Sequence, residues 1–168
     1  MAISKFQIYK TITDKDGSCR DINFDGAKWI GIESFIEKVA DLYSSLKCQV
    51  WQFEEEANEV GYKDIINNLK RSGASAQIYA EDINNILQQL QIFIFTEKNG
   101  QPFLELTFFP QDINLEPENI DAFINLVRDW NDILKAKKFF VRYENASWKF
   151  GDESKYSGVI YTSDMDFA

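Results

Sequence analysis

The stretch "QIFIFTEKNGQPFLELTFF", residues 91–109, carries the clearest signal for the fold in this sequence. Two strand-like apolar runs flank "EKNG", where asparagine and glycine can take the positive φ values that tight hairpin turns require. We therefore predict a hairpin of paired strands over residues 91–96 and 102–109, with Pro110 ending the second strand.

The clearest helix follows this hairpin and runs from Pro117 to about Ala136. Proline stands in its first turn, acidic residues come early and lysines close it, an order that agrees with the helix dipole. Apolar residues at helical spacing predict one buried face, which places Trp130 in the core. The residues of that face are Ile120, Phe123, Ile124, Val127, Trp130 and Leu134.

Toward the C-terminus, "KFFVRY" (138–143) and "SGVIYTS" (157–163) are predicted strands. A polar turn over 142–152 lies between them, and two interpretations of it stay open. Its asparagine and serine can cap local backbone groups, which makes it a structural turn. Its arginine, asparagine and aromatic residues are also types that carry contact energy in interfaces, which makes it a recognition loop.

Toward the N-terminus, "FQIYKTIT" (6–13) alternates apolar and polar residues before a "DKDG" turn signal, so a first strand is predicted there. Part of "RDINF" (20–24) is expected to pair back on it. Apolar residues then recur at helical spacing from Phe35 to Leu46, which predicts a helix with Ser34 as its N-cap.

Three shorter segments complete the assignment. "QVWQF" (49–53) is rich in aromatic and β-branched residues and is a predicted strand. "YKDIINNLKRSG" (62–73) ends with basic residues and glycine, as a short helix does. "EDINNILQQL" (81–90) shows helical spacing, although a strand ending in "IYA" followed by another strand from near Ile86 is the alternative.

Length and composition favour one domain with a substantial core. The chain has 168 residues, of which 45% are hydrophobic and 15% aromatic, and it contains no repeat or linker-like segment. Strands occur both in succession and between helices. We predict a single α+β domain over residues 1–168, with a largely antiparallel sheet and helices packed on one face.

The residue types exclude several mechanisms. There is no histidine, so His-based general bases, Ser-His-Asp and Cys-His systems and His-ligated metal sites cannot come from this polypeptide alone. Two cysteines, Cys19 and Cys48, are too few for a closed zinc site, and the glycine signatures of nucleotide-binding loops are missing. "DKDGSCRD" (14–21) matches a calcium loop only in part and is interpreted as a turn. We expect no metal or organic cofactor.

The charge points to cationic partners. The net charge of −9 and the pI of about 4.6 disfavour direct binding to nucleic acid and attract basic proteins. The N-terminus turns polar before an apolar signal segment can form, and the apolar runs are too short to span a membrane. These features predict a cytoplasmic protein.

Two acidic clusters are the candidate partner-binding surfaces. Residues 111–132 hold six acids and one arginine, which gives a local charge of −5. "EEEANE" (54–59) is a second cluster, and a solvated helix start is its simplest interpretation. The candidate partner-binding residues are Glu118, Asp121, Asp129, Asp132, Glu54, Glu55 and Glu56.

These observations favour binding over catalysis. We expect a non-catalytic protein-binding domain, an immunity protein that neutralises a basic bacterial toxin such as a nuclease through an acidic surface. Two alternatives stay open. A carboxylate-dependent hydrolase needs only two acidic groups across a cleft, and a structural or assembly subunit is expected to self-associate or expose a large apolar patch.

Overall fold

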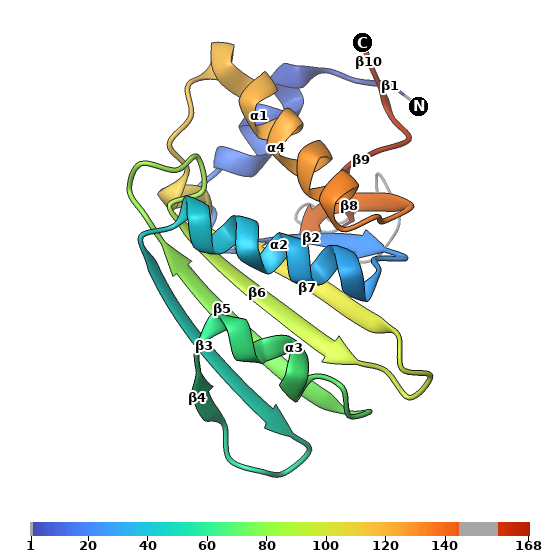
Figure 1. The fold of residues 1–168 in the computed structure, drawn as a ribbon. Helices are drawn as coiled ribbons and strands as arrows, with labels where there is room; N and C mark the ends of the chain where they lie inside the picture. Colours follow the sequence, from blue (N-terminus) through green and yellow to red (C-terminus); the bar gives the residue numbers. More distant parts are fainter. Residues whose placement is uncertain (1, 145–157) are drawn as a thin grey trace.

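The computed structural model describes residues 2–144 and 158–168 of the chain. These residues form an eight-stranded antiparallel sheet (Figure 1). Its strands are β2 (Arg20–Asp25), β3 (Ser45–Gln52), β4 (Asn58–Val60), β5 (Ala74–Glu81), β6 (Gln89–Thr96), β7 (Pro102–Phe108), β8 (Lys138–Tyr143) and β9 (Val159–Thr162). Their order across the sheet is β4-β3-β5-β6-β7-β2-β8-β9. Two further short strands, β1 (Ala2–Ile3) and β10 (Asp166–Phe167), pair in parallel.

The helices lie mainly over one face of this sheet. They are α1 (Lys5–Thr13), α2 (Trp29–Leu42), α3 (Ile65–Asn68) and α4 (Ile120–Ile133), with short 3-10 segments η1 (Tyr62–Asp64), η2 (Pro110–Asp112) and η3 (Pro117–Asn119). Figure 1 shows α2, α3 and α4 across that face, and α1 packs beside α4. The predicted α+β class, with a largely antiparallel sheet, is confirmed.

The predicted hairpin is present as β6 and β7. Thr96 pairs with Pro102, and the loop between them is closed by a hydrogen bond from the Glu97 N–H to the Gln101 carbonyl at 2.9 Å. Gly100 takes φ +81 there, the conformation that the sequence predicts for this turn.

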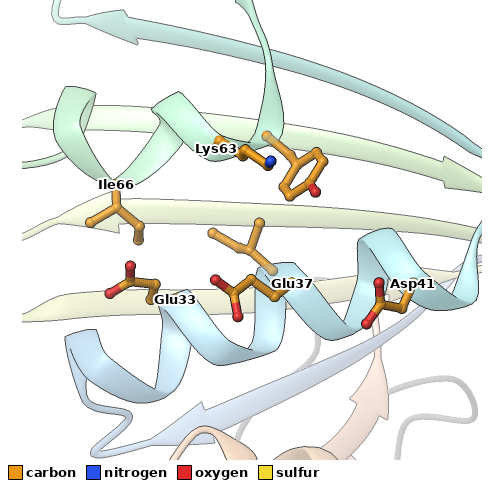
Figure 2. Close-up of a pocket in the computed structure, with 7 residues that line it drawn as sticks. Glu33, Glu37, Asp41, Lys63 and Ile66 are labelled. Carbon is orange, nitrogen blue, oxygen red and sulfur yellow. The ribbon is translucent and has the colours of Figure 1, made fainter.

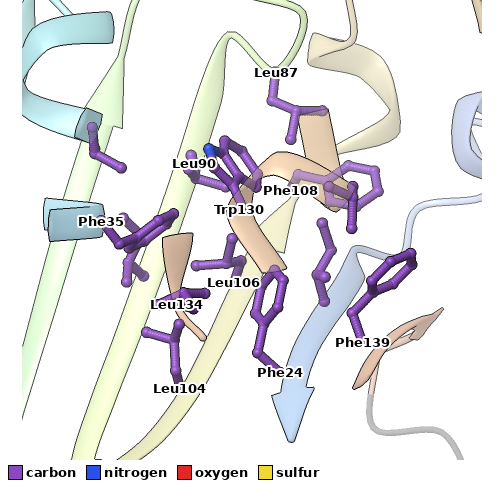
Figure 3. Close-up of a cluster of buried hydrophobic side chains, with 14 of the residues drawn as sticks. Phe24, Phe35, Leu87, Leu90, Leu104, Leu106, Phe108, Trp130, Leu134 and Phe139 are labelled. Carbon is purple, nitrogen blue, oxygen red and sulfur yellow. The ribbon is translucent and has the colours of Figure 1, made fainter. Parts of the chain in front are cut away.

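The core lies between these central strands and the helices (Figure 3). Alternate residues of β6 and β7, such as Ile92 and Leu106, are fully buried. Trp130 on α4 is 1% exposed and packs edge-to-face on Phe35 of α2, with ring centroids 5.7 Å apart. The burial of Trp130 confirms the predicted apolar face of the long helix, which η3 and α4 together form.

The predicted strand over residues 6–13 is wrong, because this segment is α1. Ser4 and Gln7 form a reciprocal capping box, with both side chain to backbone distances at 3.1 Å. Ile8 and Ile12, one helical turn apart, are fully buried, whereas Phe6 is 62% exposed. β2 therefore pairs with β7 and β8 and not with this segment.

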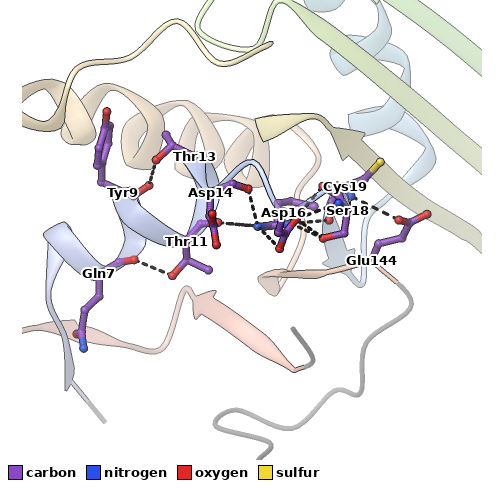
Figure 4. Close-up of polar contacts among 10 residues, drawn as sticks. Gln7, Tyr9, Thr11, Thr13, Asp14, Asp16, Ser18, Cys19 and Glu144 are labelled. Carbon is purple, nitrogen blue, oxygen red and sulfur yellow. Dashed lines mark hydrogen bonds and ion pairs between the residues drawn. The ribbon is translucent and has the colours of Figure 1, made fainter. Parts of the chain in front are cut away.

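Arg20 stabilises the C-terminal end of α1 by hydrogen bonds to Thr11, which Figure 4 labels. Its guanidinium is fully buried and donates two hydrogen bonds to the Thr11 carbonyl, at 2.9 and 3.1 Å, which satisfies a carbonyl in the last turn of the helix. It also forms an ion pair with Asp16 at 3.1 Å. Burial raises the pKa of Asp16, but hydrogen bonds from Ser18 and Arg20 outweigh that effect and hold the pKa below its usual value. The predicted turn in "DKDGSCRD" is confirmed.

Two other boundaries differ from the prediction. α2 begins at Trp29, so Ser34 is not an N-cap: its hydroxyl donates to the Ile30 carbonyl inside the helix at 3.2 Å. The helical spacing in 81–90 is also misleading, because an Asp82 turn connects β5 to β6 there and leaves Ile83 77% exposed. The alternative of two strands is correct, although β6 begins at Gln89.

The remaining short elements agree with the sequence. The strand predicted at 49–53 belongs to β3, and the short helix predicted at 62–73 is η1 followed by α3. Of the predicted polar turn over 142–152, residues 145–152 lie outside the described part of the chain.

Candidate partner-binding surface

The acids predicted on the long helix share its outer face. Glu118 in η3 and Asp121, Asp129 and Asp132 in α4 are all exposed and lie opposite the buried stripe. We call these four residues the α4 stripe. Asp121 forms a surface ion pair with Lys5 at 2.7 Å, which offsets one of the four negative charges of the stripe. Among the described residues, no ion pair within 4.0 Å involves the other three.

Arg128 is the one basic residue of this region, and it is directed toward the C-terminal strands. Its guanidinium donates to the Tyr161 hydroxyl at 3.2 Å and lies 5.5 Å from the centroid of the Phe167 ring. The stripe therefore keeps a net negative charge.

The second predicted cluster, Glu54, Glu55 and Glu56, lies in the turn between β3 and β4. The predicted helix start is wrong here, because Phe53 takes a positive φ of 49° and the Glu55 N–H closes a turn on the Gln52 carbonyl at 3.0 Å. All three glutamates are exposed. Figure 1 places this turn at the opposite end of the molecule from α4, so the two predicted clusters do not form one patch.

A third acidic row lies on α2 and was not among the predicted site residues. Glu33, Glu37 and Asp41 follow one another at four-residue spacing along one side of the helix (Figure 2). The signal was visible in the sequence, but the predicted helix began at residue 34 and left Glu33 out.

This row forms one side of a groove of about 410 Å³ between α2 and the η1–α3 segment. Ile36, Ile66 and Tyr62 supply its apolar surface, and Lys63 is the one basic residue among the described residues that line it. Three carboxylates and one ammonium give the groove a charge of −2. Such a groove suits a lysine or arginine side chain, whose aliphatic stem packs on apolar groups while its charged end meets carboxylates.

A buried polar cluster lies on the sheet face opposite the helices. Ile22 and Phe24 of β2 point into the core, so Asp21 and Asn23 point to the other face. Their cross-strand partners include Thr107, Glu105 and Arg142. The Arg142 guanidinium lies 3.2 Å from Glu105 and 3.8 Å from Asp21, and it donates to the Asn23 side-chain oxygen at 2.9 Å.

Asp21 is the most perturbed carboxyl of this cluster. Its residue is 4% exposed, and burial raises its pKa to about 6, with Glu105 and Glu144 adding repulsion. The hydrogen bond from Thr107, at 2.8 Å, and the charge of Arg142 act in the opposite direction but do not compensate. The sequence shows the polar alternation in β2, but only the pairing of β2 with β7 and β8 brings the cluster together.

The Asp21→Asn variant is expected to be more stable than the wild type at neutral pH, by about 2 kcal/mol. The folded pKa of about 6 lies above the ordinary value of 3.8, so the folded state favours the protonated carboxyl. The contribution of Asp21 to the stability of the fold is therefore greatest below its ordinary pKa of 3.8, and it is lost as the pH rises through about 6. The full difference corresponds to at most about 3 kcal/mol, and Asn imitates the neutral form.

Urea denaturation across the pH range tests this expectation. The advantage of Asp21→Asn should be small near pH 4, grow as pH rises and become constant above about pH 7. Asp25→Asn, at an exposed position on the same strand, is the control and should change stability by less than about 0.5 kcal/mol. Equal stability of wild type and Asp21→Asn at every pH would contradict the raised pKa.

Asp21 and Glu105 bear on the hydrolase alternative, because both carboxylates lie beside one guanidinium. Asp21, however, is nearly inaccessible, and the carboxylates are engaged by Thr107, Asn23 and Arg142.

Within residues 2–144 and 158–168, no group of three or more acidic or cysteine side chains could hold a metal ion. In the same part of the chain, no helix is long and apolar enough to cross a membrane.

Comparisons with known proteins give one likeness, at the level of fold. No family model matches the sequence, and no curated protein matches it. The structure is similar to a chain of the crystal structure of the toxic C-terminal tip of CdiA from Pseudomonas aeruginosa in complex with immune protein. The TM-score is 0.54 at 12% identity, and the match covers 88% of this chain and 96% of that chain. The likeness shows a shared fold.

Proposed function

We propose that this chain is an immunity protein, a non-catalytic inhibitor that binds a basic bacterial toxin through the acidic surface of its helix layer. The observation that carries the proposal is the α4 stripe: four exposed carboxylates on one helix face, of which only Asp121 has an ion-pair partner within the described residues. The α2 row of Glu33, Glu37 and Asp41 adds to the negative charge of the helix layer.

The fold likeness supports the class of function. The similar chain belongs to a complex between a toxic domain and an immune protein. An inhibitor of this kind needs a stable scaffold and a complementary surface, and it needs no catalytic group of its own. The lack of histidine in this chain is therefore compatible with an inhibitor.

Electrostatics supports the basic character of the partner. A protein with a net charge of −9 attracts cationic proteins at separations up to about the Debye length, beyond which salt screens the charges. A nuclease binds phosphate, so its active site is commonly basic and attractive to such a surface. An acidic inhibitor that covers this active site would block the substrate, because its carboxylates would bind the basic residues that otherwise bind phosphate.

Neutralising the α4 stripe is expected to slow partner binding. The quadruple variant Glu118→Gln, Asp121→Asn, Asp129→Asn, Asp132→Asn should associate about tenfold or more slowly at low salt, with a flatter dependence of the rate on ionic strength. The partner is first obtained by affinity capture from the native cell and mass spectrometry. Association rates are then measured by stopped flow at several salt concentrations.

The turn between β3 and β4 provides a matched control at the other end of the molecule. The triple variant Glu54→Gln, Glu55→Gln, Glu56→Gln removes three charges without touching α4, so its effect should be no more than about threefold. Equal association rates for the wild type and the quadruple variant would refute the α4 stripe as the contact surface. Capture of nothing but a metabolite or further copies of this chain would refute the class of function.

A further inference from the structure

The groove between α2 and the η1–α3 segment combines a row of carboxylates with an apolar floor (Figure 2). Ile36 is only 2% exposed and belongs to the core, and Tyr62 and Ile66 are partly buried against that core. The wall formed by α3 is held in place, because the Leu69 carbonyl at its end accepts a hydrogen bond from the Thr96 hydroxyl at 2.6 Å. The groove is therefore present in the isolated chain.

The carboxylates of this groove lack a cation at close range. Glu33, Glu37 and Asp41 repeat a negative charge at each turn of α2, and like charges four residues apart on a helix repel each other. Among the described residues, no lysine or arginine nitrogen lies within 4.0 Å of these carboxylates. The Lys63 ammonium lies 5.9 Å from the centroid of the Tyr62 ring. A cation from another molecule would relieve the repulsion along the row.

The arrangement favours one kind of cation, the guanidinium of an arginine side chain. A metal ion is disfavoured, since the three carboxylates do not form a group that could hold one within the described part of the chain. A guanidinium carries five N–H donors in a planar fork, so it can bond to two carboxylates that lie one helical turn apart. It also stacks on aromatic rings such as that of Tyr62, whereas an ammonium is a compact and strongly hydrated charge.

We infer that this groove binds an arginine side chain of the partner protein, with the guanidinium between Glu33 and Glu37. The aliphatic stem of this arginine packs on Ile36 and Ile66, as long cationic side chains do on apolar surface. The inference rests on the proposed function for the origin of the arginine, which the basic toxin supplies. The α4 stripe accelerates encounter, whereas the groove makes a close contact that slows dissociation.

Arginine and citrulline are matched probes for the groove, because citrulline has nearly the same shape and carries a neutral urea in place of the guanidinium. Acetyl-arginine methylamide is titrated into the isolated chain, and the backbone amide resonances of Ile36, Glu37 and Ile66 are followed by NMR. These resonances should shift saturably, and acetyl-citrulline methylamide should bind about tenfold or more weakly. Equal affinities for the two probes would overturn the inference.

The double variant Glu33→Gln, Glu37→Gln tests the row itself and should abolish the saturable arginine shifts. It removes like-charge repulsion from α2, so the variant should fold. The control Glu54→Gln, Glu56→Gln removes the same charge from the exposed turn between β3 and β4, and it should keep the arginine affinity within about twofold. Equal loss of affinity in both variants would mean attraction by net charge alone and would refute the groove as a site.

The dissociation rate of the complex separates this inference from the proposed function. With the captured partner, the Glu33→Gln, Glu37→Gln variant should dissociate about tenfold or more faster and associate less than about threefold more slowly. A wild-type dissociation rate in this variant, beside slow association of the quadruple α4 variant, would refute the groove and leave the proposed function standing. Failure to capture a basic protein would refute the proposed function, while the arginine and citrulline titrations, which need no partner, decide the groove separately.

Discussion

Trp130→Ala is expected to lower the free energy of unfolding by about 3 to 5 kcal/mol, the range for removing a large aromatic side chain from a core. The side chain is 1% exposed and packs edge-to-face on Phe35, so its loss removes contacts between α2 and α4. Trp130 also lines a pocket of about 150 Å³, so truncating its side chain would enlarge a space that is already unfilled. The residual void therefore adds to the lost burial.

Equilibrium denaturation in urea measures this change, with Phe6→Ala as control. Phe6 is a large apolar residue that is 62% exposed on α1, so its truncation should alter stability by less than about 0.5 kcal/mol. If Trp130→Ala kept the wild-type midpoint and lost partner binding, Trp130 would be a surface anchor, and the assigned core would be incorrect.

Gly31→Ala is expected to destabilise the protein by about 2 to 3 kcal/mol, although alanine is the better helix former. An added Cβ on Gly31 would lie 2.5 Å from the Leu134 carbonyl carbon and oxygen and 2.7 Å from the Ile133 oxygen. These are backbone atoms at the end of α4, so no side chain can turn away. The two helices would have to separate, which disturbs the hydrogen bond from the Lys28 N–H to the Leu134 carbonyl at 3.0 Å.

Gly61→Ala is the matched control for this prediction. Gly61 has φ −71, and its nearest contact to an added Cβ would be an ordinary 3.7 Å to the Asp64 side chain. Its replacement should stay within about 1 kcal/mol of the wild type. Both variants are compared by urea denaturation. A higher free energy of unfolding for Gly31→Ala than for Gly61→Ala would contradict the close contact between the two helices.

Local sequence patterns were sufficient where every nearby signal agreed. The hairpin of β6 and β7 combines two apolar runs with a glycine that takes φ +81, and η3 with α4 combines proline, acidic residues and a long apolar stripe. The α4 stripe could be predicted as one face for the same reason, since helical periodicity alone aligns Glu118 with Asp132.

Short patterns failed where a distant residue decided the outcome. In residues 6–13 the alternation of Phe6 and Ile8 suits a strand, but the segment is a helix. Arg20 donates hydrogen bonds to the carbonyl of Thr11 in its last turn, and Ile8 is buried together with Ile12. The segment 81–90 shows helical spacing, but the Asp82 turn and the pairing of β5 with β6 override it. The Asp82 turn lies inside its window, but windows of eight to ten residues cannot report the Arg20 contact or the pairing of β5 with β6.

The sequence by itself determined the α+β class, the buried side of α4 and the acidic charge, because periodicity, turn residues and composition are local properties. Tertiary structure alone decided that the two predicted acidic clusters lie apart and that Glu33, Glu37 and Asp41 face a groove. It also decided that Asp21 meets Arg142 and that Trp130 lines a cavity. Each of these depends on strands and helices far apart in the chain, whose pairing follows from packing the whole core rather than from any single segment.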